Sequence, residues 1–237
     1  MGKVIVGIKT LIIVAVNLTG YLFLKRKVID LKKERMFEDF YQGQITEHIK
    51  VPPNFENHYG KSRDYLMDVF KKMEPGSNVL ELGCYLSKRL NWFAEKNPDL
   101  LFTGIDLSMK TLSLAKDNNE LMPNVRLVAA DFSNLPFKTG KFDAVFSHLA
   151  LYHVPYSHIE NVFKEIRRIS KKDIIMIEPF HKVLPLKQKI LLMSSPDKHT
   201  HDYRKIENDD VDRKEIRPLF DASSGYHPIT VFHYLKK

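Results

Sequence analysis

The chain has 237 residues, 43% of them hydrophobic and 28% charged, which is enough for one well-packed globular domain and an additional segment. Its single cysteine, Cys84, excludes a disulfide framework and a zinc site built from several cysteines. The net charge of +8 would suit a nucleic-acid partner, but residues 1–36 hold eight basic and only two acidic residues. The basic excess therefore belongs to this segment and does not indicate a nucleic-acid substrate for the remainder.

The N-terminal segment is apolar over residues 4–24, except for Lys9, Thr10, Asn17 and Thr19, and is followed at once by Lys25-Arg26-Lys27. About twenty such residues are enough to cross a bilayer, and basic residues flank membrane segments on the cytoplasmic side. The sequence therefore predicts that residues 1–27 are a single-pass membrane anchor with a basic flank, followed by a cytoplasmic body. A cleaved signal peptide, an interfacial amphipathic helix and a buried helix of the domain are the alternatives.

Residues 28–60 mix charged residues with apolar residues at helical spacing until Pro52-Pro53 ends the pattern. We expect a juxtamembrane helix there, followed by a lid segment. The aromatic and polar side chains that could form the lid are Tyr41, Phe55, His58 and Tyr59.

From residue 61 onward, short apolar runs alternate with helical patterns. Helices are predicted at 62–73, 90–96, 109–118, 159–170 and 184–193. Strands are predicted at 79–82, 101–105, 125–129, 142–147, 174–177, 216–220 and 229–235. Because strands this apolar must be covered on both faces, residues 61–237 are predicted to form one α/β domain, a Rossmann-like, doubly wound, mostly parallel sheet with helices on both faces.

Polar residues stand at the ends of the predicted strands, where such a sheet binds its ligands. They are Glu81 and Gly83, Asp106, Asp131, Ser147 and His148, and Glu178. Asp106 follows Gly83 by 23 residues, at the end of the second strand, where a carboxylate can accept hydrogen bonds from both hydroxyls of a ribose.

Five segments in this order are similar to class I S-adenosylmethionine-dependent methyltransferases, in particular to the group that acts on small molecules, quinones and lipids. The segments are Val79-Leu80-Glu81-Leu82-Gly83-Cys84, Gly104-Ile105-Asp106-Leu107-Ser108, Ala129-Ala130-Asp131-Phe132, Leu135-Pro136-Phe137 and the run 141–148. The resemblance implies a seven-stranded sheet whose last strand is antiparallel, and S-adenosylmethionine as the cofactor.

The resemblance also implies roles for single residues. Glu81, Gly83 and Cys84 would form the turn against the methionine part of the cofactor. Asp106 would bind the ribose, with Leu107 beside the adenine. Asp131 would accept a hydrogen bond from the adenine amino group, Phe132 would line the ring, and Ser147 would face the sulfonium.

The glycine pattern departs from that family. Its turn usually reads Glu/Asp-x-Gly-x-Gly-x-Gly, and here Tyr85 and Ser87 stand at the second and third glycines. The serine could cap the following helix, whereas the tyrosine ring must point away from the ligand or occupy its space.

The catalytic candidates His148, Tyr152 and His153 follow the fourth strand, in a loop that lines the acceptor pocket in the family. A histidine near neutral pKa could deprotonate an acidic acceptor, while the simpler interpretation is that both histidines are only packed and hydrogen-bonded. His199, His201 and Asp202 could suggest a metal site, but a polar loop is the better interpretation, and no metal is predicted.

These observations predict a membrane-anchored methyltransferase that uses S-adenosylmethionine to methylate a small-molecule or lipid-like acceptor. An inactive binding or scaffold domain of the same fold is the alternative. A nicotinamide-dependent oxidoreductase is a second alternative, disfavoured because two of its three glycines are missing.

Overall fold

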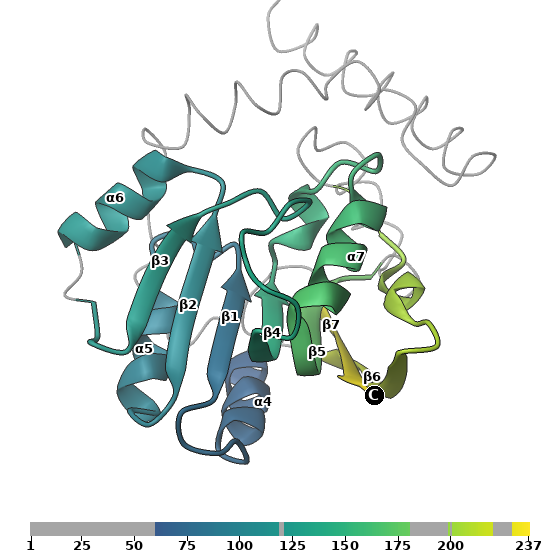
Figure 1. Cartoon of the computed structure of the whole chain (residues 1–237), viewed down its shortest axis with the longest axis horizontal. Coiled ribbons are helices and arrows are strands. Elements are labelled where there is room, and N and C mark those ends of the chain that lie inside the picture. The colour runs from purple at the N-terminus through teal and green to yellow at the C-terminus, as the bar shows by residue number, and fades with distance from the viewer. Residues whose placement is uncertain (1–59, 119–120, 181–198, 200, 220–228) are drawn as a thin grey trace, which may run out of the picture.

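The computed structural model describes residues 60–118, 121–180, 199, 201–219 and 229–237. Its helices are α4 (Gly60–Phe70), α5 (Lys88–Lys96), α6 (Met109–Asn118) and α7 (Ile159–Ile169), with two short 3-10 helices, η2 (Leu151–His153) and η3 (Tyr203–Ile206). Its strands are β1 (Asn78–Leu82), β2 (Leu101–Asp106), β3 (Val125–Ala129), β4 (Phe142–His148), β5 (Ser170–Pro179), β6 (Val211–Leu219) and β7 (Ile229–Lys236). Figure 1 shows these elements around one twisted sheet.

The sheet has seven strands in the order β3-β2-β1-β4-β5-β7-β6. The first five are mutually parallel, and β7 is antiparallel to both β5 and β6. This confirms the predicted doubly wound α/β fold with an antiparallel last strand. The carboxyl ends of the parallel strands lie at one edge of the sheet. The strand order reverses between β1 and β4, and ligands of such sheets bind at this switch point.

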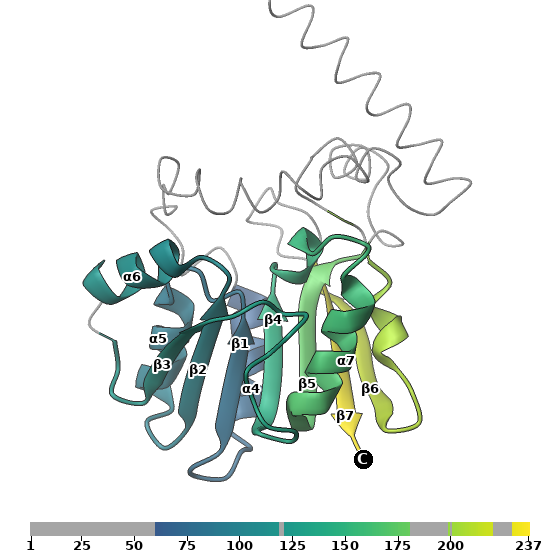
Figure 2. The same ribbon diagram turned by 45° about the horizontal axis from the view of Figure 1, so that its top comes forward.

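Helices cover both faces of the sheet (Figures 1 and 2). Alternation along each strand divides the buried side chains between two clusters. Val79 of β1 packs with residues of α4 and α5 on one face. Leu80 and Leu82 pack with residues of α7 and η3 on the other face.

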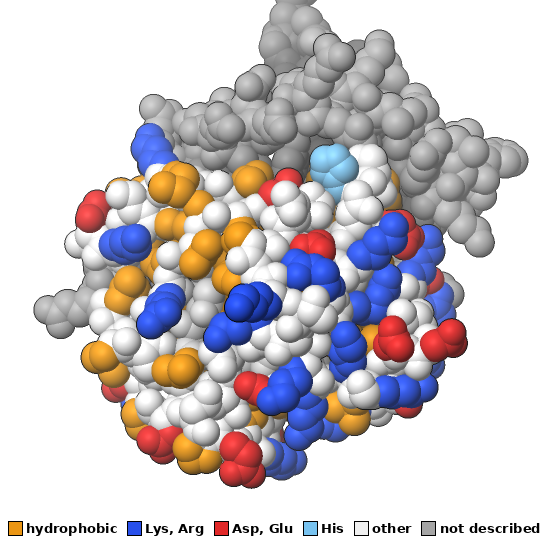
Figure 3. Space-filling model, in the orientation of Figure 1, with side chains coloured by type: hydrophobic (Ala, Val, Ile, Leu, Met, Phe, Trp, Pro, Cys, Tyr) orange, Lys and Arg blue, Asp and Glu red, His pale blue; other side chains and the backbone are white. Residues whose placement is uncertain are grey.

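The surface on the side of α7 and β6 carries many Lys and Arg side chains with Asp and Glu among them (Figure 3). Arg168 pairs with Glu165 at 2.7 Å, and Lys205 pairs with Glu160 at 3.1 Å. Such pairing of opposite charges is ordinary for a solvated surface.

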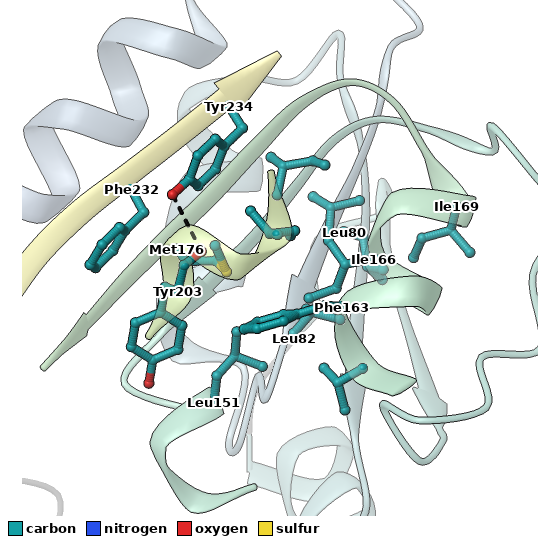
Figure 4. Close-up of a cluster of buried hydrophobic side chains, with 14 of the residues drawn as sticks. Leu80, Leu82, Leu151, Phe163, Ile166, Ile169, Met176, Tyr203, Phe232 and Tyr234 are labelled. Carbon is teal, nitrogen blue, oxygen red and sulfur yellow. Dashed lines mark hydrogen bonds between the residues drawn. The ribbon is translucent and has the colours of Figure 1, made fainter. Parts of the chain in front are cut away.

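The larger cluster includes a contact that ties β7 to η3 (Figure 4). The Tyr234 hydroxyl donates a hydrogen bond to the carbonyl oxygen of Tyr203 at 3.3 Å, and the two tyrosines flank the buried Phe232. Burial of aromatic side chains of this size contributes strongly to a core. The cluster therefore joins the irregular segment that holds η3 to the sheet.

Two strands begin earlier than the sequence predicts. Strand β5 starts at Ser170, which pairs with Phe142, although Lys171 and Lys172 are exposed. Strand β6 starts at Val211, and exposed charged residues follow directly. Charged residues are common on edge strands because they discourage pairing with another chain, and here they hide the strand from a search for apolar runs.

The predicted anchor (residues 1–27), almost all of the lid segment (residues 28–60) and the predicted helix at 184–193 lie outside the described residues. Within the described part of the chain, no helix is long and apolar enough to span a bilayer. The anchor and the division at residues 27 and 60 therefore stay predictions.

Candidate active site

The turn after β1 lies against the end of β2. The backbone N–H groups of Gly83 and Cys84 both donate to the carbonyl oxygen of Ile105, at 2.8 and 2.9 Å. Gly83 has a φ of +76°, and a Cβ atom placed on it would lie 2.5 Å from Cβ of Ala150. Only glycine fits there, because any side chain would be both strained and in collision.

The positions of the two missing glycines keep a glycine-like backbone. Tyr85 has a φ of +50° and Ser87 a φ of +57°. A residue other than glycine pays roughly 1 kcal/mol or more for this left-handed conformation. The turn therefore retains the course that a glycine-rich motif would take, although Tyr85 and Ser87 have side chains.

The side chains at these two positions differ in exposure. Tyr85 is 41% exposed, whereas Ser87 is fully buried. The predicted cap by Ser87 is wrong: its side chain makes no capping hydrogen bond to α5, and its hydroxyl instead donates to Sγ of Cys84 at 3.6 Å. The left-handed backbone is the reason, because a capping residue normally has extended geometry.

Asp106 is drawn into the same turn. Its Oδ2 accepts the N–H of Tyr85 at 3.1 Å and its Oδ1 accepts the N–H of Ser108 at 3.0 Å. Burial raises the pKa of Asp106, and these N–H groups counteract that effect. Ser108 caps α6, since its Oγ accepts the N–H of Thr111 at 3.1 Å. Leu107, beside them, is 42% exposed.

The structure brings Phe132 to the turn but leaves Asp131 at the surface. Cζ of Phe132 lies 3.6 Å from the position of a Cβ on Gly83. Asp131 is exposed, and its Oδ1 accepts the N–H and the hydroxyl of Ser133 at 2.7 and 2.8 Å. The adenine role of Asp131 stays a prediction, as does that of Phe132.

Glu81 has a partner that the sequence did not suggest. Oε1 of Glu81 accepts Nε of Arg89 at 2.9 Å and also its Nη2. Burial raises the pKa of Glu81, and Arg89 counteracts this. Arg89 lies in the first turn of α5, where a cation opposes the helix dipole. That unfavourable position was the one signal in the sequence that Arg89 needs an acidic partner.

His148 is placed differently from a catalytic base. Its Nδ1 lies 2.6 Å from Nη1 of Arg89 and its Nε2 lies 2.9 Å from Oγ of Ser62, which belongs to α4. Burial, followed by the charge of Arg89, holds the pKa of His148 well below its usual value. Both ring nitrogens are engaged with protein groups, so the geometry favours the packed and hydrogen-bonded interpretation of His148.

Tyr152 and His153 lie together on η2, with ring centroids 4.0 Å apart, and both are partly exposed. The carbonyl oxygen of Tyr152 accepts the N–H of His199 at 2.6 Å. Of the three catalytic candidates, these two are the ones whose side chains reach the surface near the strand ends.

Glu178 is fully buried at the end of β5 and anchors this loop. Its Oε1 accepts the N–H groups of Ala150 and Leu151, at 3.1 and 3.0 Å. Burial raises the pKa of Glu178 to about 7, against the effect of these N–H groups and of the nearby Ser147 hydroxyl. Ser147 is itself fully buried. The sequence placed Glu178 at a strand end without giving it a role.

The residues considered for a metal site are packed instead. The rings of His199 and His201 stack 5.9 Å apart, and Tyr156 meets each of them edge-on at 5.1 Å. Asp202 pairs with Arg204. In the part of the chain that the structure describes, no three His, Cys, Asp or Glu side chains could together hold a metal ion.

Two features of the turn fit the cofactor that the resemblance implies. Among the described residues, Oε2 of Glu81 is buried and has no hydrogen-bond partner, so it can accept from a ligand ammonium group. The carboxylate of Asp106, held by the N–H groups of Tyr85 and Ser108, can accept from a ligand hydroxyl. The roles of Glu81, Gly83 and Asp106 in holding this cofactor stay predictions, with which these contacts are compatible.

The chain is similar to known methyltransferases. Residues 79–173 match the model of a family described as a methyltransferase domain. The chain is 29% identical over 142 residues to demethylmenaquinone methyltransferase of Staphylococcus haemolyticus, covering 56% of this chain and 55% of that protein. It is 28% identical over 114 residues to cycloartenol-C-24-methyltransferase of Arabidopsis thaliana, covering 47% of this chain and 33% of that protein. It thus spans from a third to about half of the length of these relatives.

A solved structure with the same fold is that of geranyl diphosphate C-methyltransferase from Streptomyces coelicolor, in complex with Mg²⁺, geranyl diphosphate and S-adenosyl-L-homocysteine. The TM-score is 0.61 at 14% identity, and the match covers 75% of this chain and 77% of that chain.

Proposed function

We propose that this chain transfers a methyl group from S-adenosylmethionine to a small-molecule or lipid-like acceptor at a membrane. The premise is that it contains a class I S-adenosylmethionine-dependent methyltransferase domain. The observation that carries the proposal is the turn after β1. It keeps the left-handed backbone at Gly83, Tyr85 and Ser87 even though two of its glycines are gone.

The residues at the strand ends would bind different parts of S-adenosylmethionine. Glu81 offers its buried Oε2 to the ammonium group of the methionine part, and Gly83 allows the tight turn that packs against Ala150 beside it. Asp106, fixed by two backbone N–H groups, offers its carboxylate to the ribose. When bound, S-adenosylmethionine supplies an electrophilic methyl group, so the main task of the chain is to align a nucleophile with it.

A proton must leave the acceptor only where its pKa demands it. His153 and Tyr152 are the candidates for that step, because they lie on η2 beside the strand ends and are partly exposed. His148 is set aside by its two hydrogen bonds.

Two observations support the proposal of a lipid-like acceptor. The apolar segment at residues 4–24 and the basic residues after it would hold the domain beside a bilayer, facing the cytoplasm. Two curated relatives are named for cycloartenol and demethylmenaquinone, but the match covers only part of each. The acceptor class and the location are therefore proposals for this chain.

Tyr85 favours a second candidate function, a binding or scaffold domain without turnover. Its side chain stands where the family has the glycine that contacts the ligand. A ring that fills the site would leave the fold intact and remove cofactor binding.

Calorimetry of the full-length protein with S-adenosylhomocysteine decides between these functions. We expect binding, and a loss of about tenfold or more in affinity in Asp106→Asn, because the ribose loses a charged acceptor. Asp143→Asn is the matched control: this carboxylate accepts the N–H of Asn78 at 2.9 Å, at the opposite end of the sheet. Absence of binding by the wild-type protein would contradict the methyltransferase function and support the binding or scaffold domain.

Cell fractionation tests the anchor. We expect the full-length protein in the membrane fraction, released by detergent and not by high salt, because burial of an apolar segment does not depend on ionic strength. Recovery in the supernatant without detergent would contradict the anchor.

A further inference from the structure

Four side chains from four elements form one buried chain of hydrogen bonds. Ser62 of α4 contacts Nε2 of His148 of β4 at 2.9 Å, and Nδ1 of His148 contacts Nη1 of Arg89 of α5 at 2.6 Å. Arg89 in turn donates to Glu81 of β1. Ser62, His148 and Glu81 are 2%, 4% and 0% exposed, so each contact lies in a medium of low dielectric.

The chemistry of these groups fixes the direction of each hydrogen bond. The guanidinium of Arg89 can only donate, so Nδ1 of His148 must be an unprotonated acceptor. The ring is then neutral with its proton on Nε2, and this N–H donates to Oγ of Ser62. The lowered pKa of His148 agrees with a ring that stays neutral.

Arg89 also sets the state of Glu81. Two of its nitrogens, Nε and Nη2, donate to the same oxygen, Oε1, and so compensate a carboxylate with no exposed surface. Oε2 is left without a partner among the described residues. Arg89 thus holds the carboxylate through Oε1 and leaves Oε2 as its second acceptor.

We propose that Arg89 is a positioning residue that couples α4 to the cofactor turn, by holding Glu81 with one side of its guanidinium and His148, itself bonded to Ser62, with the other. A shift of α4 would then change the affinity of the turn for its ligand without any contact between α4 and that ligand. The identity of the ligand rests on the proposed function, while the coupling rests on the hydrogen bonds alone.

Two variants and a control isolate the coupling. Arg89→Lys keeps the charge but cannot serve Glu81 and His148 together, because an ammonium group lacks the planar fork. Ser62→Ala removes the link to α4 and leaves Arg89 and Glu81 in place. Asp68→Ala is the control, since this exposed residue lies on the same helix.

Imidazole nitrogen NMR of the full-length protein tests the chain of hydrogen bonds without any ligand. In the wild-type protein we expect His148 to keep the neutral form with the proton on Nε2 between about pH 5.5 and 8. In Arg89→Lys we expect a second tautomer or a protonated ring at the acidic end of that range. A proton on Nδ1 in the wild-type protein, or identical spectra in Arg89→Lys, would overturn the proposal.

Calorimetry with S-adenosylhomocysteine tests the coupling itself. We expect affinity to fall about tenfold in Arg89→Lys and about threefold in Ser62→Ala, which corresponds to the loss of single buried hydrogen bonds, and to stay unchanged in Asp68→Ala. Equal affinity in Ser62→Ala and Asp68→Ala would overturn the coupling while leaving the proposed function intact. A wild-type protein that binds no S-adenosylhomocysteine would refute the proposed function and, with it, the effect on affinity, whereas the NMR spectra would still decide the role of Arg89.

Discussion

Tyr85 combines a strained backbone with a side chain at the ligand turn. Its φ is +50°, although only glycine adopts this region without cost. Asp106 accepts the N–H of Tyr85 at 3.1 Å, and this contact helps to hold the strained conformation. Tyr85 therefore shares the strained backbone with Ser87 in this turn, but its side chain is the exposed one of the two.

Replacing Tyr85 with glycine separates these two effects. We expect Tyr85→Gly to raise the free energy of unfolding, measured by urea denaturation, by about 1 kcal/mol. We also expect it to bind S-adenosylhomocysteine at least as tightly as the wild-type protein. Tyr85→Ala removes the ring but keeps the strained backbone. We therefore expect it to bind S-adenosylhomocysteine at least as tightly as the wild-type protein, without the increase in the free energy of unfolding. Weaker binding by both variants would show that the ring belongs to the binding surface.

Gly83 makes a sharper prediction because a matched glycine exists. Gly76 has a φ of +81° and open space around its Cβ position, whereas a Cβ on Gly83 would lie 2.5 Å from Ala150. We expect Gly76→Ala to cost about 1 kcal/mol of unfolding free energy, and Gly83→Ala about 2 kcal/mol or more beyond that, from overpacking. Equal costs in urea denaturation would mean that the loop of Ala150 can move away from the turn.

Glu178 links stability to pH. Burial raises its pKa to about 7 from an ordinary value of 4.5, so the folded protein holds this proton more tightly than the unfolded chain does. The resulting stability is fully present below about pH 4.5 and is lost as pH rises through about 7, a change of roughly 3 kcal/mol.

The variant Glu178→Gln replaces the titrating carboxyl group with an amide that does not titrate. Urea denaturation at pH 5 and pH 8 should show the stability of Glu178→Gln rising relative to the wild-type protein by about 2–3 kcal/mol at the higher pH. Comparison with the exposed Glu95→Gln cancels the contributions of all other groups. A difference that does not change with pH would contradict the raised pKa.

At the scale of elements, α4 is attached to the sheet by a second polar network besides Ser62. The Tyr65 hydroxyl donates to Oε2 of Glu215 at 2.9 Å and lies 2.8 Å from Nδ1 of His233. Nε2 of His233 lies 2.6 Å from Oδ1 of Asp173. Burial, followed by the hydrogen bond to Glu215, raises the pKa of Tyr65, which keeps the hydroxyl protonated.

Removing that hydroxyl tests how firmly α4 is attached. We expect Tyr65→Phe to destabilise the protein by about 1–3 kcal/mol, since the buried His233 loses a partner. Tyr85→Phe, at a 41% exposed ring, should change stability by less than about 0.5 kcal/mol. Equal urea midpoints for the two variants would show that packing alone holds α4.

At the scale of the whole molecule, the sequence predicted what local patterns encode. Strands buried on both faces, such as residues 174–177, are continuous apolar runs, and their carboxyl ends must meet at one edge of a parallel sheet. That is why Glu81, Gly83 and Asp106 could be assigned to one site before any geometry was known, whereas Phe132 was assigned through the family resemblance.

The remainder depends on contacts between distant parts of the chain. His148 is separated from Ser62 by 86 positions and from Arg89 by 59, and no pattern in the sequence joins them. The charged residues at the start of β6 hid that strand, because an edge strand needs no apolar alternation there. Tertiary contacts, and not local propensity, decided these features.

Strand β7 is translated after every other strand of the sheet, yet it lies between β5 and β6, which are made before it. Until Ile229–Lys236 leave the ribosome, β5 has an open edge and β6 has no neighbour in the sheet. A nascent chain therefore presents the apolar edge of β5 to other proteins, the situation in which chaperones are needed. One late insertion supplies both missing neighbours at once, so this half of the sheet is completed only after β7 has been made.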